Sequence, residues 1–466
     1  MLKEKSGFSG QIGFVLAAAG SAVGVGNLWR FPYLAAKDGG GLFLIVYLCL
    51  VLTFGFTLLV SDIAIGRKTK KSCINAYAQL KPSWKGLGVL TFFVPVVIMT
   101  YYSVIGGWIT KYLTVYMTGK AEAVANDEYF DHFISDPHSS CYFALFFLIL
   151  TAVVVYNGVE KGIEKFSKFV MPVLLVLIIA IAIYSLFLEH TDASGTARTG
   201  LQGFVVYLKP DFTGMTLEKF VNVLLDAMSQ LFFSLSVSMG IMITYGSYVK
   251  DEVDLNKAVN QIEIFDTVVA FIAGAMIIPA VYCFSGTEGM NGGPGLMFIS
   301  LPKVFNEMGP VGSIIGIFFF LTAAFAALTS CVSVLEAVTA NCMELFDVSR
   351  RQATVILTLI YCVATAVISL GYSTFRMEIP LPNGSEGQLL DLMDYISNSV
   401  MMPFISLLSC IFIGWVLSPK TVTDEMEKNG EKFGRKGIYN IMIRFIAPVI
   451  MLVLFLQSVG LLEKLE

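Results

Sequence analysis

Long apolar runs follow one another along almost the whole chain and are separated by short polar segments. A helix that crosses the hydrocarbon core of a membrane needs about 20 mostly apolar residues. The runs do not alternate polar and apolar positions, as the strands of a membrane β-barrel would. The pattern therefore predicts an all-α integral membrane protein with about eleven transmembrane helices, whose approximate cores are residues 12–36, 41–65, 88–117, 141–157, 166–188, 218–246, 262–284, 311–346, 352–371, 389–417 and 438–461.

The composition agrees with a membrane protein and excludes other classes. Of the 466 residues 14% are charged and 56% are hydrophobic, whereas soluble domains carry about 25% charged residues. A soluble globular fold and a disordered chain are therefore both excluded. The sequence has no basic patch for nucleic acid, its eight cysteines form no Cys-x-x-Cys pair and its three histidines are dispersed, so a metal centre built on these residues is not expected.

The distribution of Lys and Arg predicts an orientation, because cytoplasmic loops carry an excess of these residues. With the N-terminus in the cytoplasm, cytoplasmic segments hold 21 of the 31 Lys and Arg residues and outer loops hold 8. We therefore expect a multi-pass protein of the cell membrane with a cytoplasmic N-terminus, and eleven spans place the C-terminus outside. No linker separates soluble parts, so we expect a single domain over residues 1–466.

Two of the predicted spans contain stretches that weaken a helix. They are residues 20–27 (GSAVGVGN) in the first span and residues 234–240 (SLSVSMG) in the sixth. Each glycine weakens a helix by roughly 1 kcal/mol relative to alanine. Within lipid, a broken helix is tolerated only where its free backbone groups line a protein cavity. Close packing of helices through small residues explains the composition equally well.

The spacing of the two stretches separates these explanations. They lie five spans apart, and because five is odd, two five-span units would have opposite topology. That arrangement is the inverted repeat of secondary transporters, in which half-helix ends point into a site at the middle of the membrane. We therefore expect a first five-helix repeat at 12–188, a second at 218–417 and an additional helix at 438–461.

The segment 20–33 (GSAVGVGNLWRFPY) resembles a motif of the neurotransmitter:sodium symporter family. The sequence is similar to that family's prokaryotic amino-acid transporters of the bacterial leucine transporter type. Further matches stand in the same order at 101–102 (YY), 230–236 (QLFFSLS), 326–330 (AALTS) and 391–394 (DLMD), so the resemblance covers nearly the whole chain. It implies the five-plus-five inverted-repeat fold with unwound helices 1 and 6. It also implies a sodium-coupled symporter that imports a neutral L-amino acid by alternating access.

The resemblance implies two sodium sites built from oxygen ligands, which a hard cation prefers. The first would combine one backbone carbonyl with three side chains, in the set Ala22, Asn27, Ser234 and Asp266. The second would combine three carbonyls with two hydroxyls, in the set Gly20, Val23, Ala326, Thr329 and Ser330. Hydrogen bonding to the preceding helical turn is the alternative role of the last two hydroxyls.

By the same resemblance the substrate lies between the two breaks, under an aromatic lid of Tyr102 and Phe233. The implied lining residues are Ser21, Ala22, Gly24, Gly26, Ile98, Tyr102, Phe233, Ser234, Ser236, Met239, Ser330, Ser333 and Val334. Because the side-chain end of this lining is mostly apolar, we expect a branched or aromatic side chain on the substrate.

Two charged pairs are implied as gates. Arg30 and Asp394 would form the outer gate, bridged through water above the substrate. Lys5 and Glu344 would form the inner gate, where lysine replaces the family's arginine and loses its bidentate geometry.

Asp62, Glu336 and Asp266 are among the acidic residues that lie within predicted spans, where an ionisable side chain is expected to be functional. Asp62 and Glu336 are expected to cap the unwound backbone of the sixth span. Asp266 departs from the asparagine that the family more commonly has at this position, and its charge would partly neutralise two Na⁺ bound beside a zwitterion. Many animal members use chloride for this purpose, near the positions that match Tyr47, Gln230, Ser234 and Asp266. We therefore expect no chloride beside the two sodium ions that the resemblance implies; the alternative is a protonated Asp266 that is merely hydrogen-bonded.

Other functions stay open at this point. A sodium-coupled symporter for a non-proteinogenic solute or an osmolyte is the nearest alternative, and Gly24 argues against an amine without a carboxylate. A channel would need a continuous polar pore, and a membrane enzyme would need a nucleophile–base or metal cluster; the sequence shows neither. A non-transporting amino-acid sensor is a further alternative. The implied partners are a small-molecule amino acid, sodium ions and membrane lipid, without nucleic acid, and the oligomeric state is left open.

Overall fold

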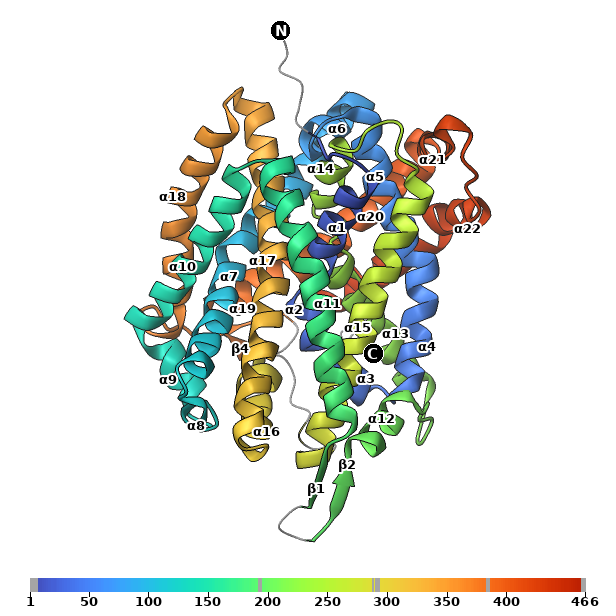
Figure 1. Ribbon diagram of the computed structural model, residues 1–466. Helices are drawn as coiled ribbons and strands as arrows, with labels where there is room; N and C mark the ends of the chain where they lie inside the picture. The colour runs from blue at the N-terminus through green and yellow to red at the C-terminus, as the bar shows by residue number, and fades with distance from the viewer. Residues whose placement is uncertain (1–6, 192–194, 287–288, 290–293, 383–385, 462–466) are drawn as a thin grey trace.

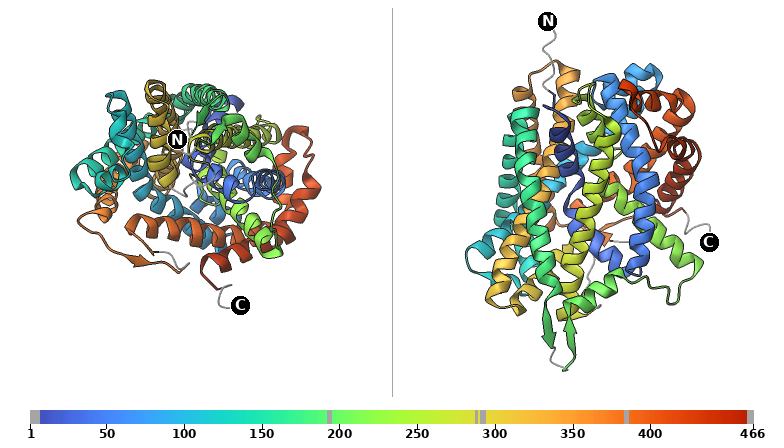
Figure 2. Two further views of the ribbon diagram at one scale, coloured as in Figure 1. Left: turned by 90° about the horizontal axis from the view of Figure 1, so that it is seen from below. Right: turned by 45° about the vertical axis from the view of Figure 1, so that its right-hand side comes forward.

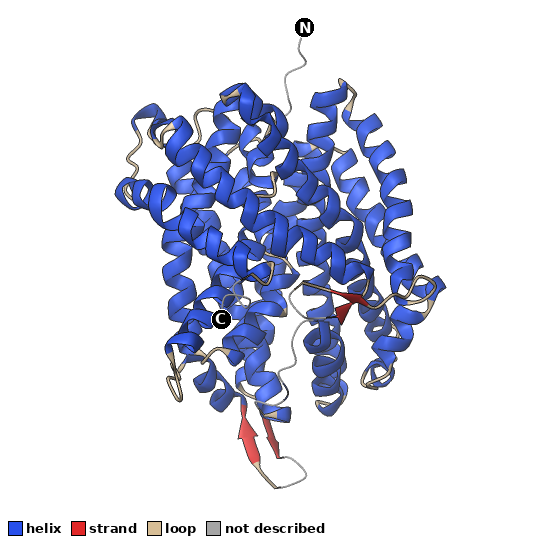
Figure 3. Ribbon diagram, turned by 180° about the vertical axis from the view of Figure 1, so that it is seen from behind, coloured by secondary structure: helices blue, strands red, loops and turns tan. Residues whose placement is uncertain are grey.

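Inside a membrane no water is available to bond with backbone polar groups, so long apolar runs must satisfy those groups within helices. In the computed structural model nearly every apolar run is helical, and the described strands form two short pairs (Figure 1, Figure 3). The structure describes residues 7–191, 195–286, 289, 294–382 and 386–461. The predicted all-helical membrane fold is confirmed.

The first half of the chain supplies spans 1 to 5. Spans 1 and 2 consist of α1 (Gln11–Ala22), α2 (Val25–Leu28), α3 (Arg30–Lys37), α4 (Gly41–Leu50), η1 (Val51–Gly55) and α5 (Phe56–Thr69). Spans 3 to 5 consist of α7 (Lys85–Met117), α10 (Pro137–Tyr156), η3 (Val159–Glu164) and α11 (Lys165–Leu186). Shorter helices connect them: α6 (Cys73–Leu80), η2 (Pro82–Trp84), α8 (Ala121–Val124) and α9 (Tyr129–Ser135).

The second half supplies spans 6 to 11. Spans 6 to 8 consist of α13 (Leu217–Leu235), α14 (Ile241–Ser247), α15 (Leu255–Ser285) and α17 (Pro310–Phe346). Spans 9 to 11 consist of α18 (Arg350–Ser369), η6 (Leu370–Tyr372), α19 (Leu389–Asp394), η7 (Tyr395–Met401), α20 (Met402–Ile411), η8 (Phe412–Leu417), α22 (Lys436–Ile441), η10 (Met442–Ile446) and α23 (Ala447–Ser458). The connecting helices are α12 (Gly200–Leu208), η5 (Leu296–Ser300), α16 (Leu301–Glu307), α21 (Lys420–Met426) and η9 (Lys428–Gly430).

By length and composition, nine helices of the described chain can cross a membrane, and the bent pair formed by α1 with α2 and α3 makes a tenth. The chain bends by 61° between the two halves of that pair. The remaining predicted span, 218–246, consists of α13 and α14 and is not among these ten. Its break shortens each half, and Glu218, Lys219 and Asp226 interrupt the first half.

The segments between the spans gather at two opposite ends of the bundle. The labelled elements α6, α14 and α21 lie at the upper end of Figure 1, whereas α8, α16 and the first strand pair lie at the lower end. That pair joins β1 (Glu189–Thr191) to β2 (Ala197–Thr199) antiparallel, with Glu189 opposite Thr199. The second antiparallel pair joins β3 (Ile379–Pro380) to β4 (Glu386–Gly387). The Lys- and Arg-rich segments at α6 and α21 therefore lie toward the same end, and the right-hand view of Figure 2 shows the two ends from another side.

The first span breaks after Ala22. Val23 and Gly24 have extended backbones, with ψ of 94° and −171°, and a new helix begins at Val25. The last carbonyl groups of α1 therefore lack partners within that helix. The glycine-rich stretch forms the break that the sequence predicts.

The sixth span breaks between α13 and α14. Ser236, Ser238 and Gly240 have φ of 52°, 61° and 72°, which is the left-handed region. This conformation costs roughly 1–2 kcal/mol for residues other than glycine. The two serines must therefore be held there by contacts with other elements.

Two contacts of Ser238 supply part of this support. The Ser238 backbone N–H donates to Asp62 Oδ2 at 2.9 Å, and the Ser406 hydroxyl donates to Ser238 Oγ at 2.5 Å. Asp62 thus caps the break as expected. Glu336 does not: it accepts a hydrogen bond of 2.5 Å from the Tyr248 hydroxyl and pairs with Arg350. Because Tyr248 follows α14, Glu336 connects the far end of span 6 to Arg350 in span 9. Of the two acidic residues, only Asp62 contacts the break.

Candidate substrate and sodium site

The two helix breaks lie side by side and are joined through serine hydroxyls. Ser236 Oγ donates to the carbonyl oxygen of Ser21 at 2.9 Å, and Ser330 Oγ on α17 donates to the same oxygen at 3.1 Å. Ser21 Oγ lies 3.1 Å from Ser236 Oγ and 2.7 Å from Ser333 Oγ. Spans 6 and 8 therefore satisfy a carbonyl group that the first break has freed.

A cavity of about 40 Å³ lies between the breaks. Its lining consists of Ser21, Gly24, Ile98, Tyr101, Tyr102, Phe233, Ser236, Met239, Ser330, Val334 and Asn398. The structure thus brings nine of the thirteen predicted substrate residues together here. The other four do not line the cavity: Ala22, Gly26, Ser234 and Ser333.

Two lining residues were not predicted, Tyr101 and Asn398. Tyr101 is the first residue of the tyrosine pair that carries the family resemblance. Asn398 follows Asp394 by one helical turn, and that spacing was the signal that could have identified it.

Gly24 allows two neighbouring helices to reach the first break. A Cβ atom at this position would lie 3.0 Å from Ser330 Oγ and 3.2 Å from the Tyr102 hydroxyl. The Tyr102 hydroxyl also accepts a hydrogen bond of 3.4 Å from the Val25 N–H, at the start of α2. The start of a helix presents free N–H groups and favours an anionic group. The Tyr102 hydroxyl and the start of α2 therefore lie together at one side of the cavity.

Three of the residues predicted for the first sodium site converge beside the cavity. Asn27 Nδ2 donates to Asp266 Oδ1 at 2.9 Å, and Ser234 Oγ lies 2.8 and 2.9 Å from the two Asp266 oxygens. The three residues are at most 1% exposed. Their amide, hydroxyl and carboxylate oxygens form a compact set that fits a hard cation such as Na⁺. Ala22, the fourth residue, ends α1, where carbonyl groups lack helical partners.

The residues predicted for the second sodium site lie where α1 meets α17. Thr329 Oγ1 donates to the carbonyl oxygens of Phe325 and Ala326 at 3.0 and 3.1 Å. This is the bond to the preceding turn that the sequence leaves open as an alternative. Ser330 Oγ instead reaches across to the first break, where Val23 O lies 3.4 Å away. A Cβ at Gly20 would lie 3.3 Å from Thr329 Cβ, so the two helices are close at this point.

Two residues of the predicted anion-site set carry polar atoms without a partner. In the described chain the Tyr47 hydroxyl and Gln230 Oε1 are buried and make no hydrogen bond. Gln230 Nε2 donates to the carbonyl oxygen of Gly26 at 3.3 Å. The other members of the set, Ser234 and Asp266, bond to each other.

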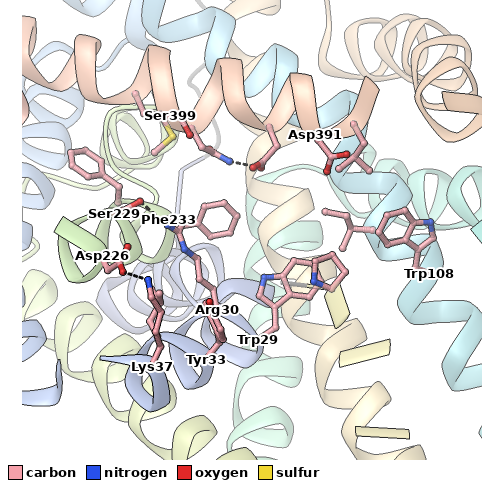
Figure 4. A pocket seen from close by; sticks show the side chains of 18 of the residues that line it. Trp29, Arg30, Tyr33, Lys37, Trp108, Asp226, Ser229, Phe233, Asp391 and Ser399 are labelled. Atoms are coloured by element: carbon pink, nitrogen blue, oxygen red, sulfur yellow. Dashed lines mark hydrogen bonds and ion pairs between the residues drawn. The ribbon is translucent and has the colours of Figure 1, made fainter. Parts of the chain in front are cut away.

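A second, larger cavity of about 420 Å³ adjoins the first and is shown in Figure 4; we call it the outer cavity because it contains the predicted outer gate. Arg30 and Asp394 both line it, together with Trp29, Trp108 and Tyr372. Within the described residues no hydrogen bond or ion pair joins Arg30 to Asp394. Arg30 Nη2 donates to Ser229 Oγ at 2.7 Å, and its guanidinium lies 5.9 Å from the centre of the Phe233 ring. The predicted outer pair is therefore present in one cavity and separated.

Charged side chains are among those that line the outer cavity, including Lys37, Asp226 and Asp391 (Figure 4). Lys37 Nζ lies 2.7 Å from Asp226 Oδ2 and 4.0 Å from Asp38 Oδ1. Asp38 directly follows α3. Its burial, reinforced by the nearby Asp226 carboxylate and opposed by Lys37, raises the pKa of Asp38 to about 7.

At the opposite end, half of the predicted inner pair lies outside the described residues, because Lys5 precedes residue 7. Glu344 Oε1 accepts hydrogen bonds from the backbone N–H and the hydroxyl of Ser72, at 3.0 and 3.1 Å. Its Oε2 accepts from Asn75 Nδ2 at 3.0 Å. Glu344 therefore caps the start of α6, and its predicted pairing with Lys5 stays a prediction.

Comparison with known proteins gives matches along the whole chain. The model of the sodium:neurotransmitter symporter family matches residues 5–138 and 132–466. YhdH, an uncharacterized sodium-dependent transporter of Bacillus subtilis, is 31% identical over 463 residues, which cover 98% of each chain. A creatine transporter of Torpedo marmorata is 24% identical over 90% of this chain and 73% of its own length.

A solved structure resembles the chain over almost its whole length. The crystal structure of MhsT in complex with L-phenylalanine is 35% identical in sequence, with a TM-score of 0.83. The match covers 97% of this chain and 100% of the MhsT chain. The broken first and sixth spans therefore belong to a fold that a solved structure shares.

Proposed function

The chain belongs to the sodium:neurotransmitter symporter family, and from this premise we propose that it uses sodium to import a neutral, hydrophobic L-amino acid. Membership makes the chain a multi-pass, sodium-dependent membrane transporter and not an enzyme. The observation that carries the finer proposal is the cavity between the two helix breaks. It brings the two helix breaks, several hydroxyl groups and an apolar wall together around one space.

The polar side of the cavity suits the backbone part of an amino acid. The substrate carboxylate binds where the Tyr102 hydroxyl meets the start of α2, because free N–H groups at a helix start favour an anion. The ammonium group binds near the carbonyl end of α1 at Ala22 and the hydroxyl of Ser236. Opposite helix ends thus meet the opposite charges of the zwitterion.

The apolar side of the cavity suits a branched or aromatic side chain. It is formed by Ile98, Phe233, Met239 and Val334. Met239 has an unbranched, flexible side chain that adapts to ligands of different shape. The similar protein MhsT was crystallised with L-phenylalanine, which supports an aromatic substrate for this chain as well.

Two sodium ions accompany the substrate in this proposal. The first is held by the carbonyl of Ala22 and the side chains of Asn27, Ser234 and Asp266, beside the substrate carboxylate. The second is held between α1 and α17, by the carbonyls of Gly20, Val23 and Ala326 and the hydroxyls of Thr329 and Ser330. The second site requires Thr329 to rotate away from its bonds to the preceding turn.

Chloride is not required, because Asp266 supplies a fixed negative charge in the region of Tyr47 and Gln230. The test is uptake with sodium gluconate in place of sodium chloride. Equal uptake in the two salts is expected. A large loss of transport without chloride would contradict the role given to Asp266.

Transport proceeds by alternating access between the two ends of the bundle. The excess of Lys and Arg assigns the end that holds α6 and α21 to the cytoplasm, and with it the N-terminus. The cavity that holds Arg30 and Asp394 then faces outward, and closure of this pair above the substrate begins the inward half of the cycle. The C-terminus lies outside.

A non-proteinogenic solute with a carboxylate is the second candidate substrate. The relative from Torpedo marmorata is named a creatine transporter, and creatine carries a carboxylate without being one of the twenty amino acids. Gly24 leaves no acid at the first break for a carboxylate-free amine. An osmolyte or an unusual amino acid therefore fits the same polar side of the cavity.

The experiment is a thermal-stability screen of the purified protein with the twenty amino acids, in sodium and in potassium. Ligand at a hundred times its Kd should stabilise the protein by about 2.7 kcal/mol. Stabilisation by one or a few hydrophobic amino acids, in sodium only, is expected. Stabilisation by none of the twenty in sodium would contradict amino-acid binding and favour an osmolyte or an unusual solute.

Two alanine substitutions of glycine provide matched controls for this screen. Gly24→Ala places a methyl group against Ser330 and Tyr102, so it should abolish the stabilisation. Gly86→Ala places a methyl group where no atom lies within 4 Å, so it should leave the stabilisation intact. Loss of stabilisation in both variants would show that the effect does not arise at the break.

A further inference from the structure

Two side chains separate the outer cavity from the substrate cavity, because Phe233 and Asn398 line both. Phe233 is the predicted aromatic lid. Asn398 lies on η7 in span 10, four residues after Asp394. A polar side chain in this partition lies between the substrate and the outer gate.

The Asn398 amide is bound to the acidic half of that gate. Nδ2 donates to Asp394 Oδ1 at 2.6 Å and to the Tyr101 hydroxyl at 3.0 Å. A carboxylate only accepts hydrogen bonds, which fixes the amide nitrogen on the Asp394 side. Asp394 is therefore held by its own helix and, through Asn398, linked to span 3.

The basic half of the gate has a different partner. Arg30 donates to Ser229 on α13, and Asp394 accepts from Asn398 on span 10. When the outer pair closes, the Asp394 carboxylate must therefore either give up its hydrogen bond from the Asn398 amide or accept hydrogen bonds from Asn398 and Arg30 together.

The helix that carries Asn398 is distorted at this point. Span 10 is α-helical up to Asp394 and π-helical from Tyr395 to Met401. Five other described segments are also π-helical, so the wide turn marks an irregular stretch of helix and is not by itself a sign of a site. The wide turn begins directly after the gate residue, so the segment that must rearrange when Asp394 changes partner is also the irregular one.

We propose that Asn398 is a gating residue that holds Asp394 away from Arg30 and so keeps the outer cavity open until substrate has bound. This role rests on the proposed alternating-access transport. Asn398 acts through Asp394. Its amide also lines the substrate cavity, so a bound substrate can disturb the Asn398–Asp394 hydrogen bond, which we call the latch.

The test measures access to the outer cavity without any substrate. Ile105→Cys places a thiol in the wall of that cavity, and a charged, membrane-impermeant thiol reagent reports its exposure in sodium buffer. The parent chain without this substitution gives the background from the native cysteines. With Asn398→Ala added, labelling should slow by roughly tenfold, the shift expected when one hydrogen bond to a charged group no longer opposes closure.

Three further variants make the test specific. Asn398→Ser, whose side chain is too short to reach both partners, should also slow labelling and serves if the alanine variant does not fold. Ile396→Ala changes the same π-helix but neither cavity, so its labelling rate should equal that of the parent. Asp394→Asn removes the charge that attracts Arg30, so adding Asn398→Ala in that background should change little.

The outcomes separate the latch from other roles. Labelling that is unchanged or faster in Asn398→Ala overturns the proposal, as does equal slowing in Ile396→Ala. If slowing persists unchanged in the Asp394→Asn background, Asn398 does not act through Asp394 and the proposal also fails. Because the assay needs no substrate, a failed amino-acid screen counts against the proposed function and leaves this result to be judged separately.

Discussion

Asp266 places a carboxylate against two predicted sodium ligands, Asn27 and Ser234, at 2.8 to 2.9 Å. Its position within a predicted span made it a functional candidate from the sequence. Its neighbours could not be derived from spacing, because they come from spans 1 and 6. The family resemblance supplied them, and the structure places all three side chains together.

Asp266→Asn should make transport depend on chloride. The amide keeps the hydrogen bonds but removes the negative charge, so the apparent sodium affinity should fall by roughly tenfold or more in chloride-free buffer, given the strength of charge interactions at short range. Added chloride should restore part of this loss. Sodium-dependent uptake in the two salts measures the effect.

Glu263→Gln is the matched control, since Glu263 lies one turn earlier on α15 and pairs with Arg435 away from the site. It should lower thermal stability without changing the dependence on either ion. If Asp266→Asn behaves like Glu263→Gln in uptake, the charge of Asp266 has no role in sodium binding.

Asp38 predicts a pH dependence of stability. Its pKa is raised from 3.8 to about 7, so between these values the folded protein holds a proton that the unfolded chain has released. The free energy of unfolding therefore falls as the pH rises through this window. Asp38→Asn should flatten the decline in thermal midpoint between about pH 5 and pH 8. Equal slopes in the variant and the parent would show that Asp38 does not titrate in this range.

At the scale of elements, the two helix breaks were predictable and their support was only partly so. Glycine density located the first break, and serine density located the second. Asp62 and Glu336 were both expected to cap the break in the sixth span, and the structure confirms this for Asp62 only. Both are acidic residues within spans, and only the packing shows that Glu336 faces Tyr248 and Arg350.

Asp62→Ala should destabilise the sixth span at its break. It leaves the buried Ser238 N–H without its partner, at a cost of about 1–3 kcal/mol. Asp62→Asn keeps an acceptor oxygen and should be milder. Thermal unfolding measures both, and the ligand-dependent part of the stability should fall more in the alanine variant.

Thr57→Ala serves as a control on the same helix, because the Thr57 hydroxyl bonds only to the preceding turn among the described residues. Its effect on the thermal midpoint should be small, and ligand should stabilise it as it does the parent. A loss in Thr57→Ala as large as that in Asp62→Ala would show that the break does not depend on Asp62 in particular.

At the scale of the whole molecule, ten of the eleven predicted spans are long and apolar enough to cross a membrane among the described residues, and the broken sixth span is not. The order of the spans, but not every span, therefore followed from hydrophobicity. Long-range contacts between loops did not follow from it. Arg67 was predicted only as one of many loop cations, yet its side chain is 0% exposed. Its Nε donates to Glu425 at 2.7 Å and its Nη1 to the carbonyl oxygen of Val253 at 2.6 Å.

Arg67→Ala should therefore destabilise the whole molecule. It removes the arginine that joins span 2 to α21 and to the segment before α15, and it leaves the Glu425 carboxylate without its buried partner. Loss of one partner of a buried pair costs about 3–5 kcal/mol. Lys68→Ala, at the exposed neighbouring position, should have little effect. Similar thermal midpoints for the two variants would contradict this account of the inner end.

The central claim is that sodium drives a hydrophobic amino acid through the site between the two breaks. Uptake of radiolabelled phenylalanine or leucine into proteoliposomes, with sodium outside and potassium inside, tests it most directly. The account predicts accumulation above the outside concentration that requires the sodium gradient and is lost in Gly24→Ala. Uptake that is equal when potassium replaces sodium on both sides, or no uptake of any hydrophobic amino acid, would contradict it.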